Sequence, residues 1–451
     1  MQNQCIILGY PRLNHERNYV HAWMPYALFV IAKAIESSYP EIDVVIFDGH
    51  VQSLDEWDQL LRERCNNILF VGLSIMTGGG QIKYALDMAE RMRDIMGEKT
   101  KLVFGGPHVN VLPEDTLRHP LVDVVLFGPG QYSVPAFIEA LKNDAGFENV
   151  PGLLMKNGKK IIKGQSNPLK KNLFNGYPWH IVDIEKNIRK EATLTDRTFG
   201  YISSFGCPYG CRFCYEGIAR GFVSLDATTI LDDVEMLVNE HNVSGIKFYD
   251  ADFFIQMERV QAFCEGLLTR KLDVKWAASI HPKDVARMDN KRPGLLDLIA
   301  KTGCSRLLMG IESGSNRVLK EIVDKKCTVE MIAHAVQRIA GVGIRGSYTF
   351  IIGFPGESAA EKQETIAMIE RLRRIQPEPE IRAHLYMPYP GTPLFDEAVR
   401  RGFVKRNSLE LWSDCDYYKN QTPWTSQDDV QLIDKLTSQQ NLIHRGARYE
   451  N

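Results

Sequence analysis

Residues 201–214 read YISSFGCPYGCRFC, a short apolar segment followed by a loop with three cysteines. Residues 201–205 have the composition of a short strand, and the loop that follows carries Cys207, Cys211 and Cys214. Thiolates favour iron–sulfur clusters or zinc, and a four-iron cube held by three cysteines keeps one iron free for another ligand. The alternative is a zinc site completed by a distant Cys264, Cys304 or histidine. The loop therefore predicts a metal centre at the end of a strand.

Around this loop, six short apolar segments separated by helical patterns predict six strands. They are Tyr201–Phe205, Gly245–Tyr249, Val274–Ile280, Arg306–Gly310, Gly346–Ile352 and Ile381–Tyr386. One helix should begin after Asp226, where Asp226 or Thr228 can cap it and Ile230, Val234 and Leu237 share one face. Six βα units in about 200 residues predict a partial TIM-like barrel, with its chemistry at the carboxyl ends of the strands.

Upstream, five further βα units predict an α/β domain with a doubly wound, Rossmann-like parallel sheet. The predicted strands are Cys5–Leu8, Val44–Phe47, Ile68–Leu73, Leu102–Phe104 and Val122–Phe127. Between the two regions the alternation of predicted strands and helices stops, and the sequence is rich in Gly, Asn, Lys and Pro. The pair Asn157-Gly158 within this segment predicts a hairpin. We therefore expect a doubly wound domain at 1–143, a linker at 144–198, the partial barrel at 199–402 and a C-terminal tail or cap at 403–451.

Composition excludes several classes of protein. The 451 residues hold 54 Lys plus Arg against 56 Asp plus Glu, a net charge of −2, which provides no field to gather nucleic acid or a membrane surface. We accordingly expect neither as a partner. An odd count of nine scattered cysteines argues against a full disulfide framework. Because neither a leader pattern nor an apolar run of about 18 residues is present, we expect a cytoplasmic protein.

The C-x3-C-x2-C spacing, with the aromatic Phe213 before the third cysteine, resembles the signature of radical S-adenosylmethionine enzymes. The resemblance covers about residues 200–401. It implies a 4Fe–4S cluster on Cys207, Cys211 and Cys214 whose free iron binds S-adenosylmethionine. It also implies a 5′-deoxyadenosyl radical that abstracts hydrogen from a small-molecule substrate, and an external reductant such as flavodoxin or ferredoxin.

Other barrel segments are similar to motifs of the same family. The 249–253 segment is similar to the one that meets the methionine amino group, and 310–315 resembles the fourth-strand motif that contacts S-adenosylmethionine. The resemblance implies cofactor contacts for Phe213, Asp250, Glu312, Ser313 and Gly353, and substrate or catalytic contacts for Asp252, Tyr386 and Tyr389. The bland alternatives are that Asp252 caps the next helix and that the two tyrosines only pack.

The N-terminal domain, over about residues 1–142, resembles the cobalamin-binding domain of B12-dependent radical S-adenosylmethionine enzymes. The resemblance rests on Gly105-Gly106-Pro107-His108 and Gly128-Pro129-Gly130-Gln131 after the fourth and fifth strands. It implies cobalamin contacts from Ser74, Thr77, Gly105, Gly106, Gly128 and Gln131. No D-x-H-x-x-G motif is present, so we expect His108 to be a loop residue and not a cobalt ligand. The second loop lacks the two acids of the family's Gly-Glu-Gly-Glu, so a domain that has lost cobalamin is an alternative.

With cobalamin, the resemblance implies methylation of an unactivated carbon, or of phosphorus, in a small metabolite of natural-product or cofactor biosynthesis. Without cobalamin, the same barrel implies a radical dehydratase, epimerase, cyclase or oxidase acting on a small polar metabolite. A zinc-stabilised binding protein that is not an enzyme is the third hypothesis.

Overall fold

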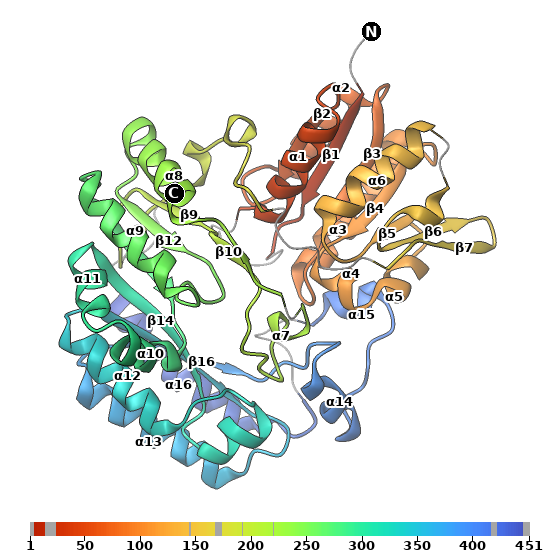
Figure 1. Ribbon diagram of the computed structural model, residues 1–451. Helices are drawn as coiled ribbons and strands as arrows, with labels where there is room; N and C mark the ends of the chain where they lie inside the picture. Colours follow the sequence, from red (N-terminus) through yellow and green to blue (C-terminus); the bar gives the residue numbers. More distant parts are fainter. Residues whose placement is uncertain are drawn as a thin grey trace. The chain divides into compact units, whose positions relative to one another are not determined.

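The computed structural model describes residues 4–13, 24–143, 146–166, 174–191, 193–219, 221–415 and 422–444. The chain divides into two compact units. The first comprises Met1–Asn187 and Lys405–Lys419, and the second comprises Ile188–Val404 and Asn420–Asn451. Each unit is built on one seven-stranded sheet (Figure 1).

The sheet of the first unit has the order β2-β1-β3-β4-β5-β6-β7, of which the first five strands are parallel. These strands are β1 (Cys5–Tyr10), β2 (Asp43–Asp48), β3 (Ile68–Ser74), β4 (Lys101–Gly105) and β5 (Val124–Leu126). The helices are α1 (Tyr26–Ser38), α2 (Leu54–Arg64), α3 (Gly80–Met96), α4 (Pro107–Val111), α5 (Pro113–Arg118) and α6 (Gly130–Asn143). The predicted doubly wound sheet is confirmed.

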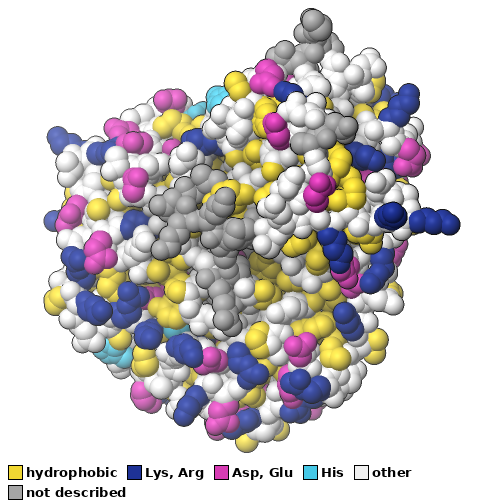
Figure 2. Space-filling view, turned by 45° about the vertical axis from the view of Figure 1, so that its right-hand side comes forward, with side chains coloured by type: hydrophobic (Ala, Val, Ile, Leu, Met, Phe, Trp, Pro, Cys, Tyr) yellow, Lys and Arg dark blue, Asp and Glu magenta, His cyan; other side chains and the backbone are white. Residues whose placement is uncertain are grey.

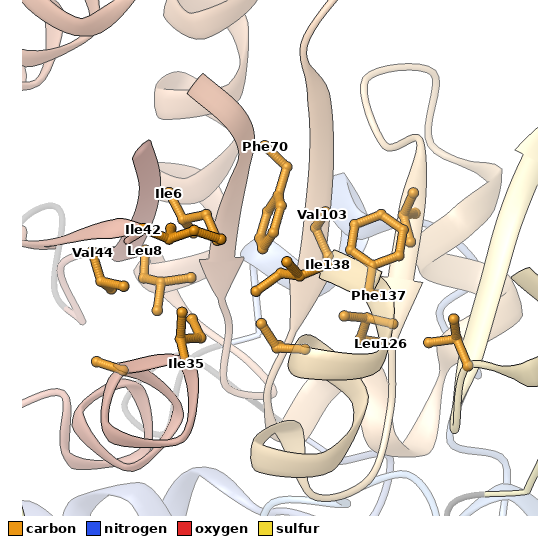
Figure 3. Close-up of a cluster of buried hydrophobic side chains, with 14 of the residues drawn as sticks. Ile6, Leu8, Ile35, Ile42, Val44, Phe70, Val103, Leu126, Phe137 and Ile138 are labelled. Carbon is orange, nitrogen blue, oxygen red and sulfur yellow. The ribbon is translucent and has the colours of Figure 1, made fainter. Parts of the chain in front are cut away.

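Both faces of this sheet are covered by helices. Figure 3 shows the core on one face, where Phe70 of β3 meets Phe137 of α6 with ring centroids 5.4 Å apart, and Ile35 of α1 joins the same cluster. On the other face, Trp57 of α2 is fully buried and its indole nitrogen donates to the Met88 carbonyl of α3 over 3.1 Å. The continuous apolar strands follow from burial on both sides.

The segment expected as a linker is divided in the structure, because its first part completes the sheet of the first unit. The hairpin predicted at Asn157-Gly158 is present as β6 (Leu153–Asn157) and β7 (Lys160–Lys163), with Gly158 at a φ of 59°. Strand β6 pairs antiparallel with β5, so the hairpin belongs to the first unit. The boundary between the units consequently falls after Asn187.

The sheet of the second unit has the order β16-β15-β14-β13-β12-β9-β8. Its six parallel strands are β9 (Thr198–Tyr201), β12 (Gly245–Phe248), β13 (Lys275–Ser279), β14 (Cys304–Glu312), β15 (Arg345–Ile352) and β16 (Glu380–Leu385), and β8 (Ile188–Arg189) runs antiparallel to β9. The helices between them are α8 (Ala227–His241), α9 (Met257–Thr269), α10 (Pro282–Lys291), α11 (Leu295–Lys301), α12 (Val329–Gly341) and α13 (Ala359–Ile375). The predicted partial, TIM-like barrel is confirmed.

One predicted strand has the wrong extent. The first barrel strand ends at Tyr201, whereas Ser204–Phe205 forms a separate strand, β10, which pairs antiparallel with β11 (Val223–Ser224). The short α7 (Glu216–Ala219) lies between them. Asp226 caps α8 as expected and accepts a hydrogen bond from the Thr229 amide over 2.8 Å.

After the last barrel strand, the chain contributes segments to both units. Helix α14 (Pro393–Arg400) belongs to the second unit, α15 (Leu409–Ser413) packs on α3 of the first, and α16 (Gln427–His444) returns to lie along β16. Among the described residues, no helix is long and apolar enough to span a membrane. Figure 2 shows charges of both signs interspersed over the visible face, in keeping with the near-zero net charge.

Candidate active site

The three cysteines of the loop after β10 are half-exposed. Gly206 makes the turn into this loop with a φ of 85°, and a Cβ there would lie 1.7 Å from the Gly221 carbonyl oxygen. Only glycine fits such a position. The backbone therefore starts the loop on a fixed path and places Cys207, Cys211 and Cys214 on one short segment.

Arg212 anchors the middle of this loop to other parts of the barrel. Its amide donates to the Val323 carbonyl over 2.9 Å, and its guanidinium donates to the Glu321 carbonyl over 2.9 Å. The Leu394 amide in turn donates to the Arg212 carbonyl over 3.1 Å. Segments that follow β14 and β16 thus hold the loop.

The thiols of the loop fit a metal cluster. Burial raises the pKa of Cys207 to about 12 and also raises that of Cys211, so without a metal both thiols keep their protons at neutral pH. Within the described ranges, no three His, Cys, Asp or Glu side chains gather around a single ion position. A four-iron cube has no such requirement, because three thiolates would bind three different irons and need not surround a single ion.

Tyr209, between the first two cysteines, is docked into the barrel. Its hydroxyl donates to Asp284 Oδ1 over 2.7 Å, and its ring stacks on His281 at 3.9 Å between centroids. Asp284 is fully buried and also pairs with Arg287, while His281 caps α10 by accepting from the Lys283 amide over 3.1 Å. The tyrosine consequently ties the cysteine loop to the start of α10.

We expect Tyr209→Phe to leave the fold intact and to speed the loss of a reconstituted cluster to a chelator several-fold. A hydrogen bond to a charged group contributes about 1.5–3 kcal/mol, which here restrains the loop. Decay of the visible absorbance measures the rate. Tyr39→Phe is the matched control, because Tyr39 donates to Glu139 over the same 2.7 Å on the surface of the first unit. Equal rates in the two variants would contradict the restraint.

Asp250 and Asp252 have their carboxyl groups turned into the protein. Asp250 accepts from the Ser203 amide over 3.1 Å and from the hydroxyls of Ser203 and Ser204. Asp252 Oδ1 accepts from the Phe254 amide over 2.9 Å, and α9 begins with Gln256 as its N-cap, so Asp252 does not cap that helix. Their cofactor and substrate roles stay predictions.

Asp252 lies beside a second buried carboxyl group. Burial, with a further contribution from the charge of Asp284, raises the pKa of Asp252 well above its ordinary value. One oxygen of each carboxyl has no hydrogen-bond partner among the described residues. A proton held by Asp252 allows these two oxygens to pair, since two adjacent buried carboxylates cannot both ionise.

Glu312 and Ser313 end β14 with their side chains engaged. Glu312 has a φ of 68° and forms a buried ion pair with Lys325, with 2.9 Å between Oε1 and Nζ. The Ser313 hydroxyl lies 3.2 Å from Thr365 Oγ1 and accepts from the Ser315 amide over 3.1 Å. The predicted S-adenosylmethionine contacts of both residues are untested.

Phe213 and Tyr386 come together through Phe354. The Phe213 and Phe354 ring centroids are 5.7 Å apart, and those of Phe354 and Tyr386 are 5.4 Å apart. Gly353 has a φ of 86°, and its carbonyl accepts from the Trp424 indole over 2.9 Å. Tyr386 is buried, and within the described part of the chain its hydroxyl has no partner. Tyr389 lies at the turn before α14, where its carbonyl accepts from the Thr392 hydroxyl over 2.7 Å.

In the first unit, Ser74 and Gly105 end neighbouring strands at the carboxyl edge of the sheet. Gly106 follows with a φ of 93°, and a Cβ there would lie 2.7 Å from Ser74 Oγ, so this approach needs glycine. Thr77 is buried, and its hydroxyl has no partner among the described residues. A buried hydroxyl without a partner beside a glycine-lined edge fits a polar cofactor such as cobalamin.

The remaining predicted residues of this sheet edge differ in their burial and in their hydrogen bonds. The Gly128 amide donates to Asn110 Oδ1 over 2.7 Å, and Gln131 is half-buried in the first turn of α6. His108 is not a loop residue as expected, because it lies in α4, fully buried, with its ring 5.9 Å from that of Trp412. Burial lowers the pKa of His108 to about 4, so the imidazole is neutral.

Several polar residues of the barrel interior belong to none of the sequence motifs described above. They are Glu191, Lys247, Arg306, Lys325, Glu380, Arg382 and His384. A signal was present for three of them, because Arg382 and His384 alternate with Ile381 and Ala383 in the last predicted strand, and Glu380 directly precedes that strand in the same alternation. In a strand covered by helices on one face, such alternation indicates a polar opposite face.

Comparison with known families gives two matches. Residues 201–369 match the Radical SAM superfamily, and residues 17–138 match the B12 binding domain. The chain is 25% identical over 417 residues to an uncharacterized methyltransferase of Pyrococcus horikoshii, covering 91% of this chain and 86% of that protein. It is 28% identical to the anaerobic magnesium-protoporphyrin IX monomethyl ester cyclase of Rubrivivax gelatinosus, covering 88% of this chain and 69% of the cyclase. It is 25% identical to the cytidylyl-2-hydroxyethylphosphonate methyltransferase of Streptomyces wedmorensis, covering 70% and 64%.

Two solved structures share the fold. One is the radical S-adenosylmethionine methyltransferase TsrM from Kitasatospora setae, with a TM-score of 0.67 and 16% identity over 88% of this chain and 76% of that chain. The other is the cobalamin-dependent S-adenosylmethionine radical enzyme OxsB, with a TM-score of 0.70 and 17% identity over 98% of this chain and 62% of that chain.

The cysteine loop on a partial barrel, together with the match over residues 201–369, defines the class: the protein is a radical S-adenosylmethionine enzyme. Within that class, it belongs to the enzymes that carry an N-terminal B12-binding domain.

Proposed function

We propose that this enzyme uses cobalamin to methylate an unactivated carbon, or phosphorus, of a small metabolite in natural-product or cofactor biosynthesis. The observation that carries the proposal is that one chain joins the three-thiol barrel loop to a B12-binding unit. At the carboxyl edge of that unit's sheet, the buried Thr77 hydroxyl has no partner among the described residues. Methyltransferases among the relatives support it.

When bound, the cluster with S-adenosylmethionine supplies a 5′-deoxyadenosyl radical, and cobalamin supplies the methyl group. Cys207, Cys211 and Cys214 would hold the cluster. Phe213, Phe354 and Tyr386 form a contiguous aromatic wall that would exclude water from a reactive intermediate. Burial raises the pKa of Tyr386 above its ordinary value, so its phenol keeps its proton. An external reductant such as flavodoxin or ferredoxin would deliver the electron.

The test is to purify the protein without oxygen, reconstitute it with iron and sulfide, offer hydroxocobalamin and measure iron and cobalt after desalting. We expect about four iron atoms and about one cobalt atom per chain, as the cube and one corrin require. Iron without cobalt would overturn cobalamin-dependent methylation and redirect the search to dehydration, epimerisation or ring closure.

We expect Thr77→Val to raise the stability of the cofactor-free protein by about 1 kcal/mol, because it removes a buried hydroxyl that no described residue pairs with. If that hydroxyl contacts cobalamin, the same change should weaken cobalamin retention about tenfold. Urea unfolding and cobalt retention after desalting measure the two effects.

Thr116→Val is the control for this pair of effects. The Thr116 hydroxyl is buried in the same unit but donates to the Leu112 carbonyl over 2.8 Å. Its replacement should lower stability and leave cobalt retention unchanged. Full cobalt retention in Thr77→Val would remove Thr77 from the cofactor site.

A further inference from the structure

The inner face of the barrel sheet carries charged side chains. Helices lie along the outer side of the barrel sheet (Figure 1). Along β16, Ile381 and Ala383 are buried, and Glu380, Arg382 and His384 alternate with them onto the opposite face of the strand. Charged side chains of non-adjacent strands meet on that face: Arg306 of β14 approaches Glu380 of β16 to 3.7 Å across β15.

A network of ion pairs lies on this inner face of the barrel sheet. Glu191, from the segment that precedes β9, approaches Lys247 of β12 to 2.8 Å and Arg306 of β14 to 3.4 Å. Glu380 accepts from Arg382 Nε over 2.8 Å. Burial alone would raise the pKa of Glu380, but Arg382, Ser347 and Arg306 lower it to about 2, so its carboxylate is charged.

The network has more cationic than anionic groups. In the described part of the barrel interior, Lys247, Arg306 and Arg382 share the two carboxylates of Glu191 and Glu380. Arg345 of β15, the register partner of Arg306, adds a fourth cation to the same face and forms no ion pair with a described residue. At the carboxyl end of β14, Glu312 forms an ion pair with Lys325, so these two charges neutralise each other. Two positive charges therefore have no carboxylate among these groups.

Arg382 is the cation that faces open space. Its side chain is 41% exposed although it sits in the middle of a strand, whereas the Arg306 side chain is 4% exposed. Its Nε and Nη2 donate to Glu380, and no described residue accepts from Nη1. The guanidinium of Arg382 thus keeps donor capacity for a ligand.

His384 lies two residues farther toward the carboxyl end of β16, about 7 Å along the strand. Its imidazole has no hydrogen-bond partner among the described residues, and burial lowers its pKa, with Arg382 contributing. Inner-face residues of the neighbouring strands, Leu308 and Thr349, are half-exposed, whereas their outer-face neighbours are buried. The inner face beside Arg382 and His384 is therefore partly accessible.

We propose that the barrel interior binds an anionic oxygen group of the substrate, a carboxylate, phosphate or phosphonate, through Arg382, with His384 as a second hydrogen-bonding contact. This inference rests on the proposed function, since it names the substrate class of that site. A guanidinium suits such groups because its planar donors bind two oxygens at once. An anion held at Arg382 leaves the rest of the substrate to extend toward the carboxyl ends of the strands, where the cysteine loop begins.

The test measures binding of two anionic probes, methylphosphonate and propionate, to the full chain saturated with S-adenosylmethionine, by ligand-observed NMR. We expect saturable binding of at least one probe and none of the neutral analogues, dimethyl methylphosphonate and propionamide. Arg382→Gln should weaken that binding at least about tenfold, because it removes a charge-assisted contact. The preferred probe then separates a carboxylate substrate from a phosphate or phosphonate one.

Arg400→Gln is the matched control, because Arg400 also donates through Nε and Nη2 to one glutamate, Glu397, on the surface of α14. It should leave probe binding unchanged. His384→Gln is the second variant, needed if Arg382→Gln does not fold, and it should weaken binding several-fold. Equal binding by the native protein and the folded variants, or equal binding of neutral probes, would overturn the proposal. Because the assay uses no cobalamin and no turnover, failure of methylation would not alter its result.

Discussion

Replacing Cys211 by alanine is expected to abolish reductive cleavage of S-adenosylmethionine and to leave the far-UV circular dichroism near that of the native protein. Two remaining thiolates cannot occupy the three corners of a cube that the loop supplies, so the cluster should not persist. The fold should survive because Cys211 is a half-exposed loop residue that lies outside the buried sheets. Deoxyadenosine and methionine formation under dithionite measures the activity.

Cys264→Ala is the control for this experiment. Cys264 is fully buried in α9 and lies outside the loop, so its loss costs packing but should spare both iron content and cleavage. A dependence of the metal on Cys264 would instead indicate a zinc site completed by that residue. Retained cleavage in Cys211→Ala would remove the cluster assignment.

The second large effect is expected on stability. Glu312→Gln should lower the free energy of unfolding of the cluster-free protein by about 3–5 kcal/mol, because it leaves the Lys325 ammonium buried without its carboxylate. The side chains of Glu312 and Lys325 are only 8% and 7% exposed. Burial acts to lower the pKa of Lys325, yet Glu312 and Cys211 raise it above its ordinary range, so the lysine is charged. Urea unfolding measures the loss.

A double variant, Glu312→Gln with Lys325→Met, should recover most of the lost stability, since a buried charge is then removed together with its partner. The loss in the single variant should also be smaller in cluster-loaded protein, because Lys325 lies within electrostatic reach of Cys211, whose thiolate would then be negative. An unchanged unfolding midpoint in Glu312→Gln would show that the pair contributes little.

The fold was predictable from the sequence because its signals are local. The apolar strands and the helices between them repeat along the chain, and a chain of parallel βα units has few ways to close a core. The first barrel strand was placed too far toward the C-terminus because Ser204–Phe205 also has strand composition. Ser204–Phe205 pairs instead with Val223–Ser224, which lies beyond the cysteine loop in the sequence.

The hydrogen-bond partners and protonation of the site residues were less predictable from the sequence. The sequence shows that Asp250 and Asp252 follow a strand, but not that Ser203 and Ser204, from another strand end, engage Asp250 or that Asp284 lies beside Asp252. Such engagement depends on contacts between residues far apart in the chain. The cysteine loop is the exception, because its chemistry lies in the spacing of adjacent residues.

The C-terminal crossover has a consequence for the modularity of the enzyme. Residues 405–415 return to the B12-binding unit after the barrel is complete, and within them Leu409, Trp412 and Cys415 are buried. The two units are therefore not consecutive along the chain, and no single cut separates them. A chimaera that exchanges the B12-binding unit between relatives must carry two segments, residues up to 187 and the stretch around α15, or Trp412 will be left without the surface that encloses it.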